Sequence, residues 1–155
     1  MTEVIDMLAP KRILVPTDFT EDSDRALREA VDIAKTSNAK VFLLHVDANL
    51  PVSSAEFVPS EQMIRAVEKQ EERDAKAKMF EEIMKVAREA DVEIEVEERH
   101  GPTRDEILNY GQEKGVDLII IEPHTRKGLK TFLGGITDQL IKEATCPLLV
   151  LPIIH

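Results

Sequence analysis

Short apolar runs alternate with amphipathic segments along the chain. One run, Val92–Glu97, alternates apolar and acidic residues, which is typical of an edge strand with one face in water. Four runs are apolar enough to be strands buried on both faces of a sheet: Arg12–Pro16, Val41–Val46, Val116–Ile121 and Leu148–Leu151. This alternation predicts an α/β fold, an open doubly wound parallel sheet with right-handed crossovers and helices on both faces.

The first helix follows the first apolar run directly. Thr20 is the expected N-cap, and the helix should end near Ser37 and Asn38. Acidic residues in its first turn favour this start, because they face the positive end of the helix dipole. Apolar residues recur at helical spacing and form its inner face: Leu27, Ala30, Val31 and Ala34.

The longest predicted helix, Glu61–Ala90, contains neither Gly nor Pro. Thirty helical residues span about 45 Å, so its first half should project past the sheet. Glu68–Lys78 is dense in charge and is either a solvated face, held by pairs such as Glu72 with Lys76, or a partner surface. The apolar stripe is expected at Met63, Val67, Met79, Phe80, Ile83, Met84, Ala87 and Ala90.

Two shorter helices complete the pattern. After a turn at His100, Gly101 and Pro102, Thr103 is the expected cap of a helix that ends at Gly115. This helix should bury Ile107, Leu108 and Tyr110. The last helix covers about Ile136–Ala144.

Length and charge exclude several classes of protein. The 155 residues show no composition shift or repeat, which predicts a single domain over residues 1–155. A net charge of −10 argues against a nucleic-acid partner. The apolar runs are too short to cross a membrane and the first residues do not resemble a signal peptide. With Cys146 as the single cysteine, a cytoplasmic protein is expected.

The final third of the chain can build an anion site. A buried strand leads into a basic loop, His124–Gly135, and the loop leads into a helix whose N-terminus offers free N–H groups. In doubly wound sheets, ligands collect at the carboxyl ends of the strands, where strand order reverses. Those ends are expected at Pro16–Asp18, Val46–Asp47 and Ile121–His124.

Three separated motifs carry a family resemblance. LVPTDFTEDSDRAL, LLHV and PHTRKGLKTFLGGITDQLIKEATCPLLVLP resemble the universal stress protein family and its UspA-like domain, over essentially the whole chain. The resemblance implies a Rossmann-like, adenine nucleotide alpha hydrolase-like sheet with strand order 3-2-1-4-5. It also implies a homodimer joined along the last strand, here Leu148–Ile154. Many members bind ATP through a signature of Gly, two residues, Gly, nine residues, then Gly followed by Ser or Thr.

The resemblance also implies the residues of a nucleotide site. Pro16, Thr17 and Asp18 match contacts to adenine and ribose, Val46 matches a backbone contact, and Thr137 matches a phosphate contact. The candidate cofactor-binding residues are Pro16, Thr17, Asp18, Val46, Ile121, Glu122, His124, Thr125, Arg126, Lys127, Gly134, Gly135, Ile136 and Thr137. The implied cofactor is ATP or another adenine nucleotide, with Mg²⁺.

The glycine signature is altered. Its first two glycines fall on Glu122 and Thr125, and Gly134 and Gly135 lack the hydroxyl neighbour. A carboxylate about 6 Å from a phosphate costs roughly 2–3 kcal/mol at an effective dielectric near 20. A lost hydroxyl contact costs roughly another 1–3 kcal/mol.

Other features of the loop oppose these losses. Arg126, Lys127 and Lys130 can supply charge-assisted contacts, and Glu122 can bind a metal ion or pair with Arg126. Tight binding, a weak or altered site and an empty site all stay open.

Several of these residues have a purely structural alternative. Asp18 can cap the first helix or hold the Thr17–Thr20 turn, and His45 is expected to be a hydrogen-bonded core histidine. His124 is a lone histidine in its loop, and Gly134 and Gly135 can serve only to turn the chain. No catalytic residue and no metal ligand is assigned.

Two functions remain. The first is a small soluble stress-response or regulatory homodimer with a degenerate adenine-nucleotide site. The alternative is a slow ATP hydrolase or phosphate-transfer protein that uses the same site.

Overall fold

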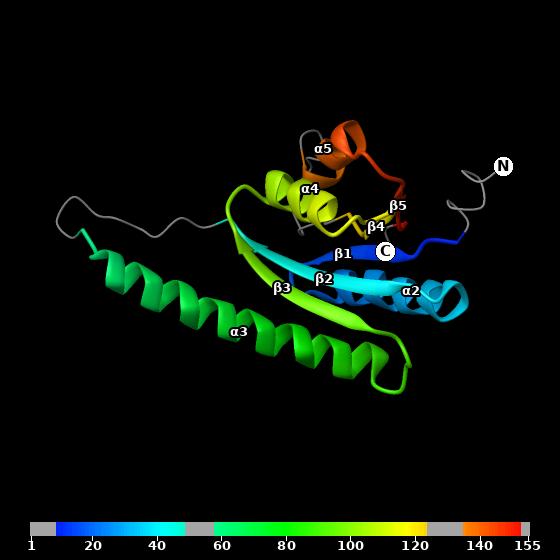
Figure 1. The fold of residues 1–155 in the computed structure, drawn as a ribbon, viewed down its shortest axis with the longest axis horizontal. Coiled ribbons are helices and arrows are strands. Elements are labelled where there is room, and N and C mark those ends of the chain that lie inside the picture. Colours follow the sequence, from blue (N-terminus) through cyan, green and yellow to red (C-terminus); the bar gives the residue numbers. More distant parts are fainter. Residues whose placement is uncertain (1–8, 49–57, 124–134, 153–155) are drawn as a thin grey trace.

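The computed structural model describes residues 9–48, 58–123 and 135–152 (Figure 1). Strands and helices alternate along this part of the chain as the hydrophobic pattern predicts. In order, they are β1 (Arg12–Thr17), α2 (Glu21–Ser37), β2 (Lys40–Asp47), α3 (Glu61–Ala87), β3 (Ile94–His100), α4 (Thr103–Glu113), β4 (Leu118–Ile121), α5 (Ile136–Glu143) and β5 (Leu148–Val150).

The strands form one parallel sheet in the order β3-β2-β1-β4-β5, which confirms the fold that the resemblance implied. Helices α2 and α3 lie on one side of the sheet, and α4 and α5 lie on the other (Figure 1). Side chains alternate along β1, so Ile13 and Val15 join the core under α2 and α3, while Leu14 joins the core under α4 and α5. Both faces of the central strands are therefore buried.

Helix α2 follows its sequence signals closely. Thr20 is its N-cap residue, and the four expected inner-face residues are all buried. Asn38 ends the helix with a left-handed backbone, φ 56°, a conformation that Asn tolerates better than most residues.

Helix α3 is long, and its first half extends past the sheet as predicted (Figure 1). The predicted apolar stripe is wrong at four positions that are 49–57% exposed: Met63, Val67, Phe80 and Met84. The helix instead turns Ala75, Met79 and Glu82 inward, at spacings of four and three residues. A stripe centred on these residues leaves Phe80 and Met84 on the flank of the helix.

Two boundaries at the start of α4 differ from the prediction. His100 is the last residue of β3 and not part of a turn, because the ladder with β2 continues until His100 lies opposite Asp47. Pro102 takes the N-cap position, and Thr103 is the first helical residue. The other end is as expected, with Gly115 following α4 at φ 62°. In the described part of the chain, no helix is both long enough and apolar enough to cross a membrane.

Candidate functional site

A cavity of about 300 Å³ opens at the carboxyl edge of the sheet, where β1 and β4 lie side by side and strand order reverses. Every helix except α3 contributes to its wall together with the ends of three strands. The lining residues are Pro16, Thr17, Asp18, Ser23, Leu44, His45, Val46, Thr103, Ile107, Ile121, Glu122, Ile136 and Thr137. A cleft at the topological switch point is therefore present in this chain.

Most of the predicted site residues in the described part of the chain line this cavity. Gly135 is the N-cap residue of α5, and its φ of −70° does not require a glycine. His124, Thr125, Arg126, Lys127 and Gly134 lie outside the described residues, so their roles stay predictions. Those brought together are Pro16, Thr17, Asp18, Val46, Ile121, Glu122, Ile136 and Thr137.

Sequence reasoning missed five lining residues. Leu44 and His45 precede Val46 on the same strand end, so their position was a usable signal. Ser23 lies in the first turn of α2, close to Asp18 in sequence. Thr103 and Ile107 come from α4, whose approach to the cavity is set by packing and leaves no local signal.

Asp18 stabilises the turn that follows β1. Its Oδ1 accepts hydrogen bonds from the backbone N–H of Thr20 at 3.2 Å, from the Thr20 hydroxyl at 2.6 Å and from the Ser23 hydroxyl at 3.2 Å. Phe19, inside this turn, has a positive φ of 68°, which is uncommon for a bulky residue. The side chain of Asp18 is exposed and also lines the cavity, so the turn and a ligand can share it.

His45 lies in the wall of the cavity. Its Nδ1 is 2.5 Å from Oε2 of Glu98, and its ring stacks on Phe19 with 4.4 Å between centroids. The expected hydrogen bond is therefore present. The expected core position is wrong, because the side chain is 21% exposed and reaches the cavity from the end of β2.

A buried polar network lies behind Thr17. The Thr17 hydroxyl is 2.8 Å from Glu82 Oε2 and 3.0 Å from Ser23 Oγ, and it accepts the N–H of Phe19. The pKa of Glu82 is raised to about 7: loss of water around the carboxyl group raises it most, the bond to Thr17 lowers it, and nearby Asp24 raises it. Lys85 pairs with Asp24 at 2.7 Å. A carboxyl group that titrates near neutral pH thus touches the cavity wall from α3.

Residues 10–152 match the model of the universal stress protein family. The chain belongs to this family. Universal stress protein MJ0531 of Methanocaldococcus jannaschii is 32% identical over 141 residues, which cover 90% of this chain and 81% of that protein.

Two solved structures show the same fold. UspA from Lactobacillus plantarum is 22% identical, covers 92% of this chain and 97% of its own, and has a TM-score of 0.73. A universal stress protein from Archaeoglobus fulgidus in complex with dAMP is 19% identical, covers 90% of this chain and 96% of its own, and has a TM-score of 0.62.

In this universal stress protein, Glu122 is the residue that the family resemblance matched to the first glycine of the signature. The Glu122 side chain is only 2% exposed, and Arg25 of α2 forms an ion pair with it. Arg25 also donates to the carbonyl of Pro152 at 3.1 Å. Burial raises the pKa of Glu122, while the Arg25 guanidinium lowers it and Asp22 raises it. Arg25 is a partner that was not considered from the sequence. Arg126 lies outside the described residues, so a pair between Glu122 and Arg126 stays a prediction, as does a metal ion at Glu122.

Proposed function

We propose that this universal stress protein is a regulatory module that binds an adenine nucleotide in the cavity at the carboxyl edge of its sheet. The cavity carries the proposal, since predicted residues from three strand ends and from α5 line it. The dAMP bound to the relative from Archaeoglobus fulgidus supports this ligand class. A volume of about 300 Å³ is at the small end of the range of about 300–1,000 Å³ for ligand pockets, so we expect a single nucleoside with its first phosphate to fill it.

The ion pair with Arg25 removes part of the penalty that Glu122 was expected to impose. A lone carboxylate repels a phosphate by roughly 2–3 kcal/mol at about 6 Å. With the Arg25 guanidinium in contact, the pair presents little net charge to a ligand. The altered signature therefore leaves room for a nucleotide, and we expect binding weaker than in a site with all its glycines, with Mg²⁺ accompanying ATP.

We also propose that the protein is a cytoplasmic homodimer joined along β5. Among the strands that the structure describes, this one is at an edge of the sheet, where one row of its N–H and C=O groups has no strand partner. Val150 at its end is 36% exposed, and Ile141 in the preceding helix is 60% exposed. A second copy of the chain would cover this apolar edge.

Nucleotide binding is tested by two measurements. Mass spectrometry of gently purified protein looks for a co-purified nucleotide, and isothermal titration compares AMP, cAMP and Mg-ATP. We expect Asp18→Ala to weaken binding about tenfold, because one hydrogen bond from a ligand to a charged group is worth about 1.5 kcal/mol. Asp32→Ala, on the exposed face of α2 and 70% exposed, is the matched control and should bind like wild type.

Failure of every adenine nucleotide to bind at millimolar concentration would contradict the proposal, as would equal affinity in Asp18→Ala and Asp32→Ala. Phosphate release from Mg-ATP, measured on the same samples, tests the alternative of a slow ATP hydrolase.

A further inference from the structure

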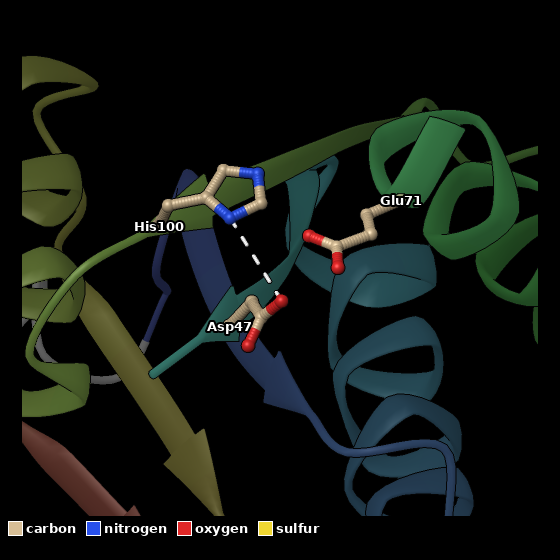
Figure 2. A group of neighbouring side chains, drawn as sticks. All are labelled: Asp47, Glu71 and His100. Atoms are coloured by element: carbon tan, nitrogen blue, oxygen red, sulfur yellow. Dashed lines mark ion pairs between the residues drawn. The ribbon is translucent and has the colours of Figure 1, made fainter. Parts of the chain in front are cut away.

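Three potential metal ligands from three different elements meet beside the cavity. Asp47 ends β2, His100 ends β3 and Glu71 lies on α3, and their ligand atoms all lie within 4.8 Å of one another. Figure 2 shows the carboxylate of Glu71 turned toward the other two side chains. Nδ1 of His100 is 3.9 Å from Oδ2 of Asp47.

The sheet fixes two of these ligands. Asp47 and His100 are register partners in the parallel pair β2–β3, so both side chains stand at the same level of the carboxyl edge. The backbone N–H of Gly101 donates to the carbonyl of Asp47 at 3.0 Å and holds the two strand ends together. The Asp47 and His100 side chains are 16% and 32% exposed. Both are therefore partly buried and still reachable from solvent.

The third ligand comes from the part of α3 that extends past the sheet. Glu71 precedes Ala75, the first buried residue of the helix, so its side chain is exposed and can adjust. Glu72 is close enough to His100 for their charges to interact, and it already pairs with Lys76 at 2.9 Å. The ligand cluster therefore combines an imidazole with two carboxylates in a chain of net charge −10.

We propose that Asp47, Glu71 and His100 form a binding site for a divalent transition-metal ion of the Zn²⁺ type. One imidazole nitrogen with two carboxylate oxygens suits Zn²⁺, whereas Mg²⁺ prefers oxygen ligands alone. Ligand atoms about 2.0–2.2 Å from a tetrahedral ion are roughly 3.4 Å apart. The cluster must therefore close by up to about 1.4 Å, mainly through movement of the Glu71 side chain. Water completes the coordination on the exposed side.

A bound ion would tie the projecting half of α3 to the sheet. In the described residues, the buried positions of α3 begin at Ala75, so the preceding turns have little packing to hold them. Asp47 directly follows Val46 of the cavity wall, so the ion would also stiffen the strand end beside the nucleotide. The metal site does not depend on nucleotide binding and is tested without nucleotide.

The test is equilibrium dialysis of chelator-stripped protein against Zn²⁺, Mn²⁺ or Mg²⁺, with bound metal measured by mass spectrometry. We expect one Zn²⁺ per chain, and at least a tenfold loss of affinity in Glu71→Gln and in His100→Gln. Glu89→Gln, which removes an exposed carboxylate just beyond α3, is the control and should keep wild-type affinity. Circular dichroism confirms that each variant is folded.

Hydrogen exchange gives a second readout. Zn²⁺ should slow exchange in residues 61–72 of the wild type and of Glu89→Gln, and should leave Glu71→Gln unchanged. The proposal is overturned if wild type binds no Zn²⁺ at sub-millimolar concentration. It is also overturned if His100→Gln or Glu71→Gln binds Zn²⁺ as tightly as the control, or if Mg²⁺ binds as tightly as Zn²⁺.

Discussion

Glu82 places a carboxyl group between α3 and the end of β1, where it touches the hydroxyl of Thr17 in the cavity wall. Its pKa of about 7 in the folded chain is above the ordinary value of 4.5. The folded state therefore holds a proton that the unfolded state releases between these two pH values. By linkage, the contribution of Glu82 to the free energy of unfolding falls as pH rises from about 4.5 to about 7, and then levels off.

Replacing Glu82 by Gln removes this titration and keeps an oxygen that accepts from Thr17. We expect Glu82→Gln to lose most of the decline in stability between pH 5 and pH 8, and to exceed wild type by about 2 kcal/mol at pH 8. Urea unfolding at four pH values measures the difference between the two profiles. Glu81→Gln, on the exposed side of α3, should follow wild type. Parallel profiles for wild type and Glu82→Gln would show that Glu82 ionises normally.

The ion pair between Arg25 and Glu122 gives a second prediction. Arg25→Met leaves the buried carboxylate of Glu122 without its cation, and we expect a loss of about 3 kcal/mol in the free energy of unfolding. The double variant Arg25→Met/Glu122→Gln should recover more than half of that loss, because the buried charge is gone as well. Denaturant unfolding of the single and double variants gives the coupling. Arg28→Met, exposed on the same helix, is the control, and an equal loss there would refute the role of the pair.

At the scale of elements, Gly111 and Gly115 lie four residues apart near the end of α4, and we expect a side chain to change stability in opposite directions at the two positions. Gly115 follows the helix with a positive φ of 62°. A Cβ there would come no closer than 3.9 Å to Arg12, so a side chain would not clash. Its cost would come only from the left-handed backbone conformation. We expect Gly115→Ala to destabilise the protein by about 1 kcal/mol and Gly115→Asn to cost less.

Gly111 is the matched control. It lies inside α4, and a Cβ there would meet Leu14 at 3.7 Å, an ordinary contact. Gly111→Ala should therefore stabilise the protein by about 0.5–1 kcal/mol. Thermal unfolding monitored by circular dichroism compares the variants, and shifts of the same sign at both glycines would contradict the assignment.

The helices show which parts of the fold the sequence could predict. Periodicity located α2 and its buried face, because the buried positions between Ala26 and Ala34 are all apolar. It misplaced the buried face of α3, where apolar residues lie on several sides and the core receives Glu82. Whether Phe80 or Met79 faces inward depends on what the sheet and α2 offer, and that is a property of the packed molecule.

The candidate site divides in the same way. Residues that directly follow strands, such as Asp18 and Val46, could be placed because parallel strands end at one edge. The partner of Glu122 could not be predicted, since Arg25 is 97 positions away and charged residues at regular spacing usually face solvent. The acidic and imidazole groups of Asp47 and His100 were likewise separated in sequence and joined only by strand register.

At the scale of the whole molecule, the two edge strands of the sheet differ in the polarity of their side chains. The β3 edge carries charged side chains, which disfavour pairing with another chain, and α3 packs against this strand. The β5 edge is short and apolar, with Val150 exposed. Pro152 follows it and lacks an N–H, which limits how far a strand partner can extend. Self-association is therefore expected through β5 and not through β3.

Light scattering after size exclusion at micromolar concentration should give twice the chain mass of 17.5 kDa. Val150→Lys places a charge in the apolar edge and should shift the protein to monomer, because burying an unpaired ammonium at an interface is costly. Val58→Lys, at a valine that is 81% exposed and distant in sequence from β5, should stay dimeric. A monomeric wild type would remove the dimer altogether, whereas a Val150→Lys variant that stays dimeric would place the interface on another surface.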